Sequence, residues 1–231
     1  MPATALPPSG SSPEPSGDKT CDASGMVEIH RMYRAGFAEG PALVTGVRDG
    51  DRAHAQVVAD NLALLSISLH AHHEGEDLKL WDAITERAPS CAIHVGRMKE
   101  QHAQMLVHLN ALDPALEQWR TTASATDAVA VLDALDGVNA ALDVHLGDEE
   151  TTIVPVMETT LTESEVEWFA KHGRASTPKG QSWYGLGAIL AAQPDGGTEW
   201  LHKNMPAPAR LLWRWVGKPK YEARRAALVG K

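Results

Sequence analysis

Cysteines, aromatic residues and long apolar runs are all scarce in this chain of 231 residues. Two cysteines, Cys21 and Cys91, are too few for a disulfide framework and suit a reducing compartment. No apolar run approaches the roughly 20 residues that a membrane-spanning helix needs. The N-terminus also lacks the basic start and apolar core of a secretion signal, so we expect a cytoplasmic protein.

Basic residues are fewer than acidic ones, 21 against 30, and the formal net charge is −9. No block of basic residues offsets this charge, so we expect neither a nucleic-acid partner nor an anionic membrane partner. The sequence also contains no Gly-rich phosphate loop, nucleophile elbow or CxxC motif. The sequence therefore offers none of these three kinds of functional site as an alternative to the histidine and acid pattern described below.

Composition divides the chain into three parts. Residues 1–24 are rich in Pro, Ser and Gly and predict a disordered N-terminal tail. Four long segments within residues 25–174 carry apolar residues at helical spacing and predict an antiparallel four-helix bundle, an all-α fold. Residues 175–231 contain recurrent Gly and Pro, four Trp and a basic end. This C-terminal extension is expected to form short helices packed on the bundle.

Turn and capping residues predict where the first helices end. Ser24 is expected to cap a first helix that ends near Ala38, because Gly40-Pro41 breaks it. A short helical segment then runs to about Val47. The second helix is expected over residues 51–87.

Prolines also shape the later helices. The third helix begins near Ser90 and is interrupted at Asp113-Pro114, and the fourth covers residues 127–160 with a kink at Pro155. Thr162-x-x-Glu165 has the form of a capping box and predicts a fifth, short helix.

Two stretches of the chain share one skeleton. Leu69-x-x-His72-x-x-x-Glu76-Asp77-x-x-Leu80 is matched by Leu142-x-x-His145-x-x-x-Glu149-Glu150-x-x-Ile153. Four residues correspond to about 40° of rotation and roughly 6 Å of rise along a helix, so each His and Glu can reach the same metal layer. Two such motifs in register predict a two-metal site in a helical bundle.

Each of the four apolar helix faces carries one histidine, and two faces add a glutamate. Buried polar groups of this kind are costly unless they are paired or bound to metal. Four imidazoles and two carboxylates match the ligand set of a carboxylate-bridged di-iron or di-manganese centre, in which each Glu can span two metals about 3.5–4 Å apart. The candidate metal ligands are His30, His72, Glu76, His102, His145 and Glu149.

Spacing leaves several neighbouring residues undecided. His73 with Asp77 forms a competing register on the second helix, and His70, His73 or Glu74 can supply a further ligand. Acids beside a ligand histidine often fix its tautomer, so Asp77 and Glu150 are either supporting residues or solvated helix charges. Tyr33, one turn from His30, either belongs to the core or lines a small-molecule channel. Five other histidines lie off the apolar faces and are not expected to be ligands: His54, His94, His108, His172 and His202.

These stretches make the sequence resemble the hemerythrin-like, HHE cation-binding proteins, and closely their actinobacterial members. The resemblance rests on His30, the HHEGEDLKLW stretch, the MKEQHAQM stretch around His102, and HLGDEETTIVP, and it covers about residues 26–172. The PAPARLLWRWVGKPKY stretch resembles an extension that some members carry. The resemblance implies a non-haem di-iron centre that meets O2, peroxide or nitric oxide. It also implies four terminal histidine ligands, bridging carboxylates from Glu76 and Glu149, and an oxo or hydroxo bridge.

One departure from the family separates the functional hypotheses. The oxygen-carrying hemerythrins place two histidines four residues apart on the third helix, whereas here Met98 and Leu106 stand four residues either side of His102. The set is one histidine short, which favours an open iron with redox chemistry over reversible O2 carriage. We therefore predict a di-iron oxidoreductase that acts on O2, peroxide, nitric oxide or a small organic substrate, with an electron donor as a possible partner. The alternatives are a non-enzymatic O2- or iron-binding sensor or store and, ranked last, a structural metal bundle. Manganese remains open as the metal.

Overall fold

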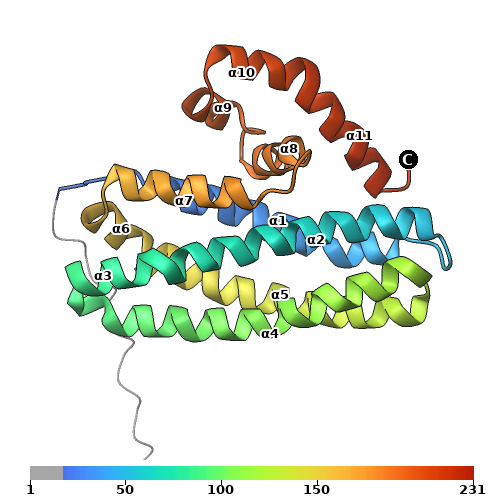
Figure 1. Ribbon diagram of the computed structural model, residues 1–231, viewed down its shortest axis with the longest axis horizontal. Coiled ribbons are helices and arrows are strands. Elements are labelled where there is room, and N and C mark those ends of the chain that lie inside the picture. The colour runs from blue at the N-terminus through green and yellow to red at the C-terminus, as the bar shows by residue number, and fades with distance from the viewer. Residues whose placement is uncertain (1–17) are drawn as a thin grey trace, which may run out of the picture.

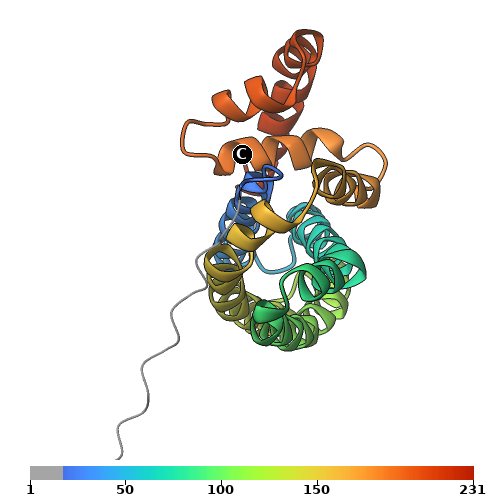
Figure 2. The ribbon, with the colours of Figure 1, turned by 90° about the vertical axis from the view of Figure 1, so that its left-hand side faces the viewer.

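The computed structural model describes residues 18–231, and every regular element in that range is helical. The longest helices lie side by side and surround a common interior (Figures 1 and 2). The all-α fold predicted from the sequence is confirmed. Within the described residues the bundle consists of α1 (Ser24–Thr45), α2 (Arg52–Gly75), α4 (Ala92–Thr122) and α5 (Ala125–Thr152).

The second rod of the bundle is not one regular α-helix. α2 passes into a π-helical turn, η1 (Glu76–Leu80), and then into α3 (Trp81–Arg87). The extent of the rod agrees with the predicted range of 51–87, but the π turn was not predicted. A short 3₁₀ turn, η2 (Pro89–Cys91), leads into α4.

Two helix breaks that we expected at prolines are absent from the described structure. α1 continues through Gly40-Pro41 to Thr45, and α4 continues through Pro114 to Thr122. Leu43 and Val44 are buried beyond Pro41. Tertiary packing of these apolar residues offsets the backbone hydrogen bond that the proline removes, so the helix continues past the proline. Beyond Pro114, α4 likewise buries Leu116 and Trp119.

The helix ends elsewhere follow the predicted signals with one exception. The break between α5 and α6 (Val154–Thr160) falls at Ile153, two residues before Pro155, and the capping box of Thr162 and Glu165 opens α7 (Glu163–Ser176). Ser24, however, is the first residue of α1 and not its cap, because Ala23 occupies the cap position without a side-chain hydrogen bond.

The chain after α7 forms short helices that lie against one side of the bundle (Figures 1 and 2). α7 itself packs along α2 and crosses residues 174–175, where we expected the extension to begin. The extension contacts the bundle through Nη2 of Arg225, which lies 2.8 Å from Oε2 of Glu39, and through Nε2 of His54, which lies 2.9 Å from the Leu228 carbonyl. Its elements are α8 (Ser182–Ala192), α9 (Thr198–Asn204), α10 (Ala207–Leu212), the π turn η3 (Trp213–Gly217) and α11 (Lys218–Leu228).

The expected N-terminal tail falls largely outside the described residues, which begin at residue 18. Its last part differs from the expectation. The backbone N–H of Thr20 donates to Glu158 of α6 at 2.7 Å, and Cys21 is buried with its thiol 3.3 Å from the Met157 carbonyl. The chain is therefore anchored before residue 24. Among the described residues, no helix is both long and apolar enough to cross a membrane.

Two apolar clusters fill the bundle and leave a polar layer between them. One contains Tyr33, Leu69, Met105 and Leu142, and the other contains Met26, Leu80, Met98 and Ile153. Along α1 and α4 the second cluster comes first, and along α2 and α5 it comes last, so the chain reverses direction at each connection. His30, His72, His102 and His145 lie between the clusters on their respective helices. The candidate ligands therefore share one level of the bundle.

Candidate metal centre

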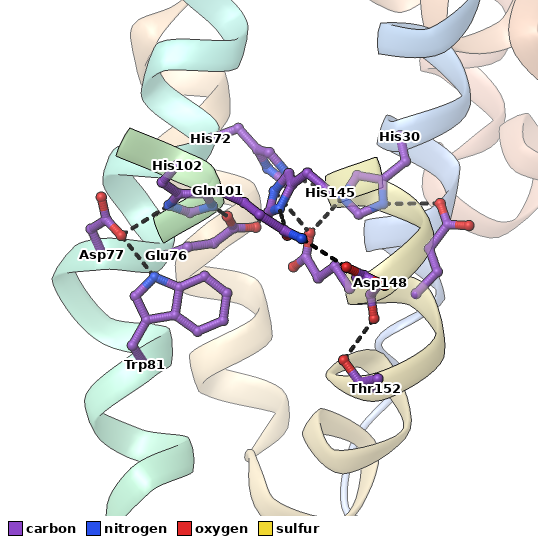
Figure 3. Close-up of polar contacts among 12 residues, drawn as sticks. His30, His72, Glu76, Asp77, Trp81, Gln101, His102, His145, Asp148 and Thr152 are labelled. Carbon is purple, nitrogen blue, oxygen red and sulfur yellow. Dashed lines mark hydrogen bonds and ion pairs between the residues drawn. The ribbon is translucent and has the colours of Figure 1, made fainter. Parts of the chain in front are cut away.

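Seven buried or nearly buried side chains form two groups of metal-donor atoms in this polar layer. Figure 3 labels five of them: His30, His72, Glu76, His102 and His145. Within each group the donor atoms lie within 4.8 Å of one another. One group consists of His30, His72, Glu76 and Glu149, and the other consists of His73, Glu76, His102 and His145. Glu76 belongs to both, so a single carboxylate connects two adjacent donor groups.

The two oxygens of Glu76 face opposite groups. Oε1 lies 3.2 Å from Nε2 of His72, and Oε2 lies 3.2 Å from Nε2 of His102. Glu149 has a comparable position, because its Oε2 lies 3.3 Å from Nε2 of His30 and 3.6 Å from Nε2 of His145. Glu76 thus lies between the two groups through both of its oxygens, and Glu149 lies between His30 and His145 through one oxygen.

Most of the converging atoms have no hydrogen-bond partner. They are fully buried: Nε2 of His73, His102 and His145, and both carboxylate oxygens of Glu76 and Glu149. Buried polar atoms without partners cost free energy, and native proteins contain few of them. Two divalent cations would satisfy these atoms together and offset the two carboxylate charges. The donor set therefore fits a dinuclear metal centre with nitrogen and oxygen ligands.

Burial shifts the pKa values of these groups in opposite directions. It lowers the pKa of His72 and His73 well below the ordinary value and that of His145 to about 3, so these imidazoles are neutral and able to ligate metal. Burial raises the pKa of Glu76, and burial together with the charge of Glu76 raises that of Glu149 to about 8. Metal binding would therefore displace protons from the carboxylates.

Acidic residues support two of the histidines from behind (Figure 3). Asp77 lies 3.0 Å from Nδ1 of His102 and also accepts a hydrogen bond from Nε1 of Trp81 at 2.7 Å. Burial opposes protonation of His102, but the nearby carboxylates of Asp77 and Glu76 outweigh burial and raise its pKa to about 9. Glu150 lies 3.0 Å from Nδ1 of His30. Contacts at Nδ1 leave Nε2 of each ring directed at the donor groups.

His145 has an amide partner instead of an acid. Nδ1 of His145 lies 3.2 Å from Oε1 of Gln101, and Nε2 of Gln101 donates to Asp148 at 2.7 Å. Gln101 was not among the residues that we predicted. Its place directly before His102 on α4 offered no spacing signal, because its partner His145 lies on another helix.

The π turn helps to place the ligands of the second rod. His72 and His73 are adjacent, so they differ by about 100° around the helix and enter different donor groups. Glu76 is the first residue of the π turn that follows both histidines, and Asp77, its second residue, points to His102. π turns inside α-helices are common at functional sites because they add a residue to one turn of the helix.

The structure brings all six predicted ligand residues into the two groups and adds His73. The adjacent His72-His73 pair had suggested His73 as a further ligand, but the spacing of the two histidines from Glu76 did not show which of them faces the interior. His70 instead contacts Asp113 at 3.3 Å, and Glu74 lies 3.5 Å from His172. Neither joins a donor group.

Tyr33 is a core residue beside the centre. Its side chain is buried, its hydroxyl donates to the Ser68 carbonyl at 3.0 Å, and its ring centroid is 5.3 Å from that of His72. Burial raises the pKa of the Tyr33 hydroxyl, so the group stays protonated. It does not line the cleft described next.

A cleft of about 1010 Å³ between α2 and α4 approaches one of the donor groups. His73 and His102 form part of its wall, with Ala71 and Ala103 beside them. Ile67, Leu78 and Leu106 contribute apolar surface, and His70, Glu74, Asp77 and Lys99 contribute polar groups. The cleft gives the group of His73 and His102 an approach from outside the bundle.

Comparison with protein families gave one match. The model of the family described as "Hemerythrin HHE cation binding domain" matches residues 23–163, a range that contains all seven donor residues. Searches of curated proteins and of solved structures found no match.

Proposed function

This chain belongs to the hemerythrin HHE cation-binding family, and we propose that it is a non-haem di-iron oxidoreductase that reacts with O2 or peroxide. The observation that carries the proposal is the pair of donor groups joined by Glu76, in which most of the converging atoms are buried and have no hydrogen-bond partner. Five imidazoles and two carboxylates are a ligand set that iron accepts, and manganese is the second choice.

Each donor group is proposed to hold one iron ion. His30 and His72 would bind one ion, and His73, His102 and His145 would bind the other. Glu76 and Glu149 would bridge them, as their distances to both groups support. The bound irons would supply the electrons for reduction of O2 or peroxide.

The protein's own part in the reaction is to orient the metal ligands and exclude water. Asp77, Glu150 and Gln101 fix three of the imidazole rings through Nδ1. The two apolar clusters close the layer above and below. Burial raises the pKa of Glu149 to about 8 in the metal-free protein, so Glu149 would release its proton when it binds metal.

The cleft favours an enzyme over a simple store. Its volume of about 1010 Å³ exceeds what O2 or peroxide requires, and its wall combines apolar and polar side chains. A small organic molecule that enters it would lie beside His73 and His102. We therefore include oxidation of such a molecule, alongside removal of peroxide or nitric oxide, in the proposed range of reactions.

Metal content and turnover test this proposal together. Purified protein reconstituted with ferrous iron without oxygen is expected to hold about two irons per chain. It should consume peroxide or O2, and Glu76→Ala and His145→Ala should abolish both iron binding and consumption. Glu74→Ala is the matched control, because Glu74 lies on the same helix outside the donor groups. Less than about one iron per chain would contradict the di-iron assignment.

Reversible O2 binding is the second candidate, and His73 is the observation that favours it. The sequence suggested a set one histidine short of the oxygen carriers, and His73 raises the number of converging imidazoles to five. A carrier or sensor would show an O2-dependent absorption band that disappears under argon and returns without turnover. Continuous consumption of O2 or peroxide would instead support the enzyme.

A further inference from the structure

The continuous helical segment α10–η3–α11 has apolar residues on two faces. On the inner face Trp213 is buried, with its ring centroid 6.3 Å from that of Trp183 on α8 and 6.4 Å from that of Tyr221. Gly217 permits this packing, because a Cβ atom there would lie 2.5 Å from the Trp183 ring. The inner face therefore packs against the extension through Trp213, and the other large apolar residues of the segment do not take part in this contact.

The opposite face of the segment exposes three large apolar side chains. Leu211 is 57% exposed, Leu212 is 50% exposed and Trp215 is 68% exposed. Leu211 and Trp215 are one helical turn apart, and Arg214 and Lys218, also one turn apart and both exposed, lie beside them. We call these five residues the outer face. Exposed apolar clusters of this kind mark interaction surfaces more often than single exposed residues do.

The charge around the outer face is opposite to that of the chain as a whole. Residues 203–221 contain five Lys or Arg and no Asp or Glu, and the first acid beyond them, Glu222, lies 3.8 Å from Lys218. Residues 173–231 carry 10 basic and 3 acidic residues, whereas residues 1–172 carry 11 basic and 27 acidic residues. The net charge of −9 therefore averages over an acidic bundle and a basic extension.

α10, the helix that carries Leu211 and Leu212, lies away from the acidic bundle. Both views show α8 and α9 between the bundle and α10, so α10 lies on the far side of the extension (Figures 1 and 2). An anionic surface that approached α10 would meet the basic extension first.

We propose that the outer face docks on an anionic lipid bilayer. Trp215, Leu211 and Leu212 enter the headgroup region, and Arg214 and Lys218 contact lipid phosphates. Trp and Leu beside Lys and Arg on one helix are the combination that binds membrane interfaces, and a convex helical ridge fits a continuous lipid surface. The leucine pair would gain nothing from a nucleic-acid backbone. This inference replaces our expectation, drawn from the whole-chain charge, that no anionic membrane is a partner.

Vesicle sedimentation with the full, metal-loaded chain tests the proposal. Vesicles of equal parts phosphatidylglycerol and phosphatidylcholine are expected to bind it at least about tenfold more tightly than pure phosphatidylcholine vesicles. Raised ionic strength should weaken the binding, because salt screens the contribution of Arg214 and Lys218.

Paired variants separate the apolar and basic contributions. Leu211→Ser with Trp215→Ala should weaken binding about tenfold or more, and Arg214→Gln with Lys218→Gln should weaken it about twentyfold. Ile93→Ser, at an 83% exposed apolar position on α4, and Lys171→Gln on α7 are the matched controls and should bind like the unmodified protein. Circular dichroism and iron content should be unchanged in all four, because none of these side chains packs in the core. As a second measurement, brominated lipids should quench the Trp fluorescence of the unmodified chain more than that of Trp215→Phe.

Four results would overturn the proposal: no binding to either vesicle, equal binding to both, loss of binding in the controls, or no effect of the outer-face variants. A salt-sensitive dimer that becomes monomeric in the outer-face variants would also overturn it, since it would assign the outer face to a second copy of this chain.

Discussion

Asp77 contacts His102 across two helices, with its Oδ1 3.0 Å from the Nδ1 of the imidazole. The same oxygen accepts the Trp81 indole N–H at 2.7 Å, so the carboxylate is held in place from its own rod. Asp77 adjoins Glu76 in sequence. Glu76 faces both donor groups, whereas Asp77 orients the His102 ring.

We predict that Asp77→Asn weakens metal binding without unfolding the bundle. Loss of such an orienting carboxylate typically costs 10–100-fold in metal affinity. Iron should leave the variant faster in a competition with a chelator. In the metal-free protein the pKa of His102, which Asp77 and Glu76 hold at about 9, should fall. A histidine titration by NMR measures this second effect, and an unchanged His102 pKa would contradict the assigned role.

His73→Ala should remove one of the two irons. The variant keeps His30, His72, Glu76 and Glu149, so the group built on these residues stays complete. Iron analysis is expected to fall from about two to about one per chain, if the second group needs its third imidazole. His70→Ala, three residues earlier and paired with Asp113, is the control and should keep both irons. Equal iron contents in the two variants would show that His73 is not a ligand.

Glu149→Gln should change the pH dependence of stability in the metal-free protein. Burial raises the pKa of Glu149 from 4.5 to about 8 in the folded state. Below pH 4.5 the Glu149 carboxyl is protonated in both the folded and the unfolded protein, so it does not reduce the free energy of unfolding. As pH rises from 4.5 to 8 the unfolded state releases a proton that the folded state retains, so stability falls, and above pH 8 the loss levels off.

The Gln variant lacks this titration. Its free energy of unfolding should exceed that of the unmodified metal-free protein by on the order of a few kcal/mol at pH 8, and the two should converge near pH 4. Chemical denaturation across this pH range measures the difference. The same variant should bind iron poorly, so its effect in the metal-loaded protein should have the opposite sign.

Ala103→Phe should slow the entry of small ligands without loss of iron. Ala103 lines the cleft beside His102, and a phenyl ring there would reduce its volume. The rate at which azide changes the absorption of the iron-loaded protein should fall several-fold. Val107→Phe, one turn later on α4 and outside the cleft lining, is the comparison, and an equal rate in both variants would place the entry route elsewhere.

The repeated register of His72 with Glu76 and His145 with Glu149 was readable without coordinates, because a helix places residues four apart on one face. The same regularity predicted one histidine on each remaining helix, and the structure brings His30 and His102 to the same level. Local proline rules were less reliable. Pro41 and Pro114 lie inside helices because apolar residues beyond each proline are buried against other helices, an interaction that no local rule contains.

By itself, the sequence determined the all-α fold, the level of the polar layer and six of its seven donor residues, since these follow from helical periodicity and burial cost. Only the tertiary structure decided that His73 joins the donor groups, because packing between helices brings its ring centroid to 4.1 Å from that of His102, a contact between α2 and α4 that spacing along the chain does not encode. It likewise decided which side chains orient the rings. Asp77 contacts His102, and Gln101 contacts His145. Each pair joins two helices, so no regular spacing in the sequence indicates that the residues meet.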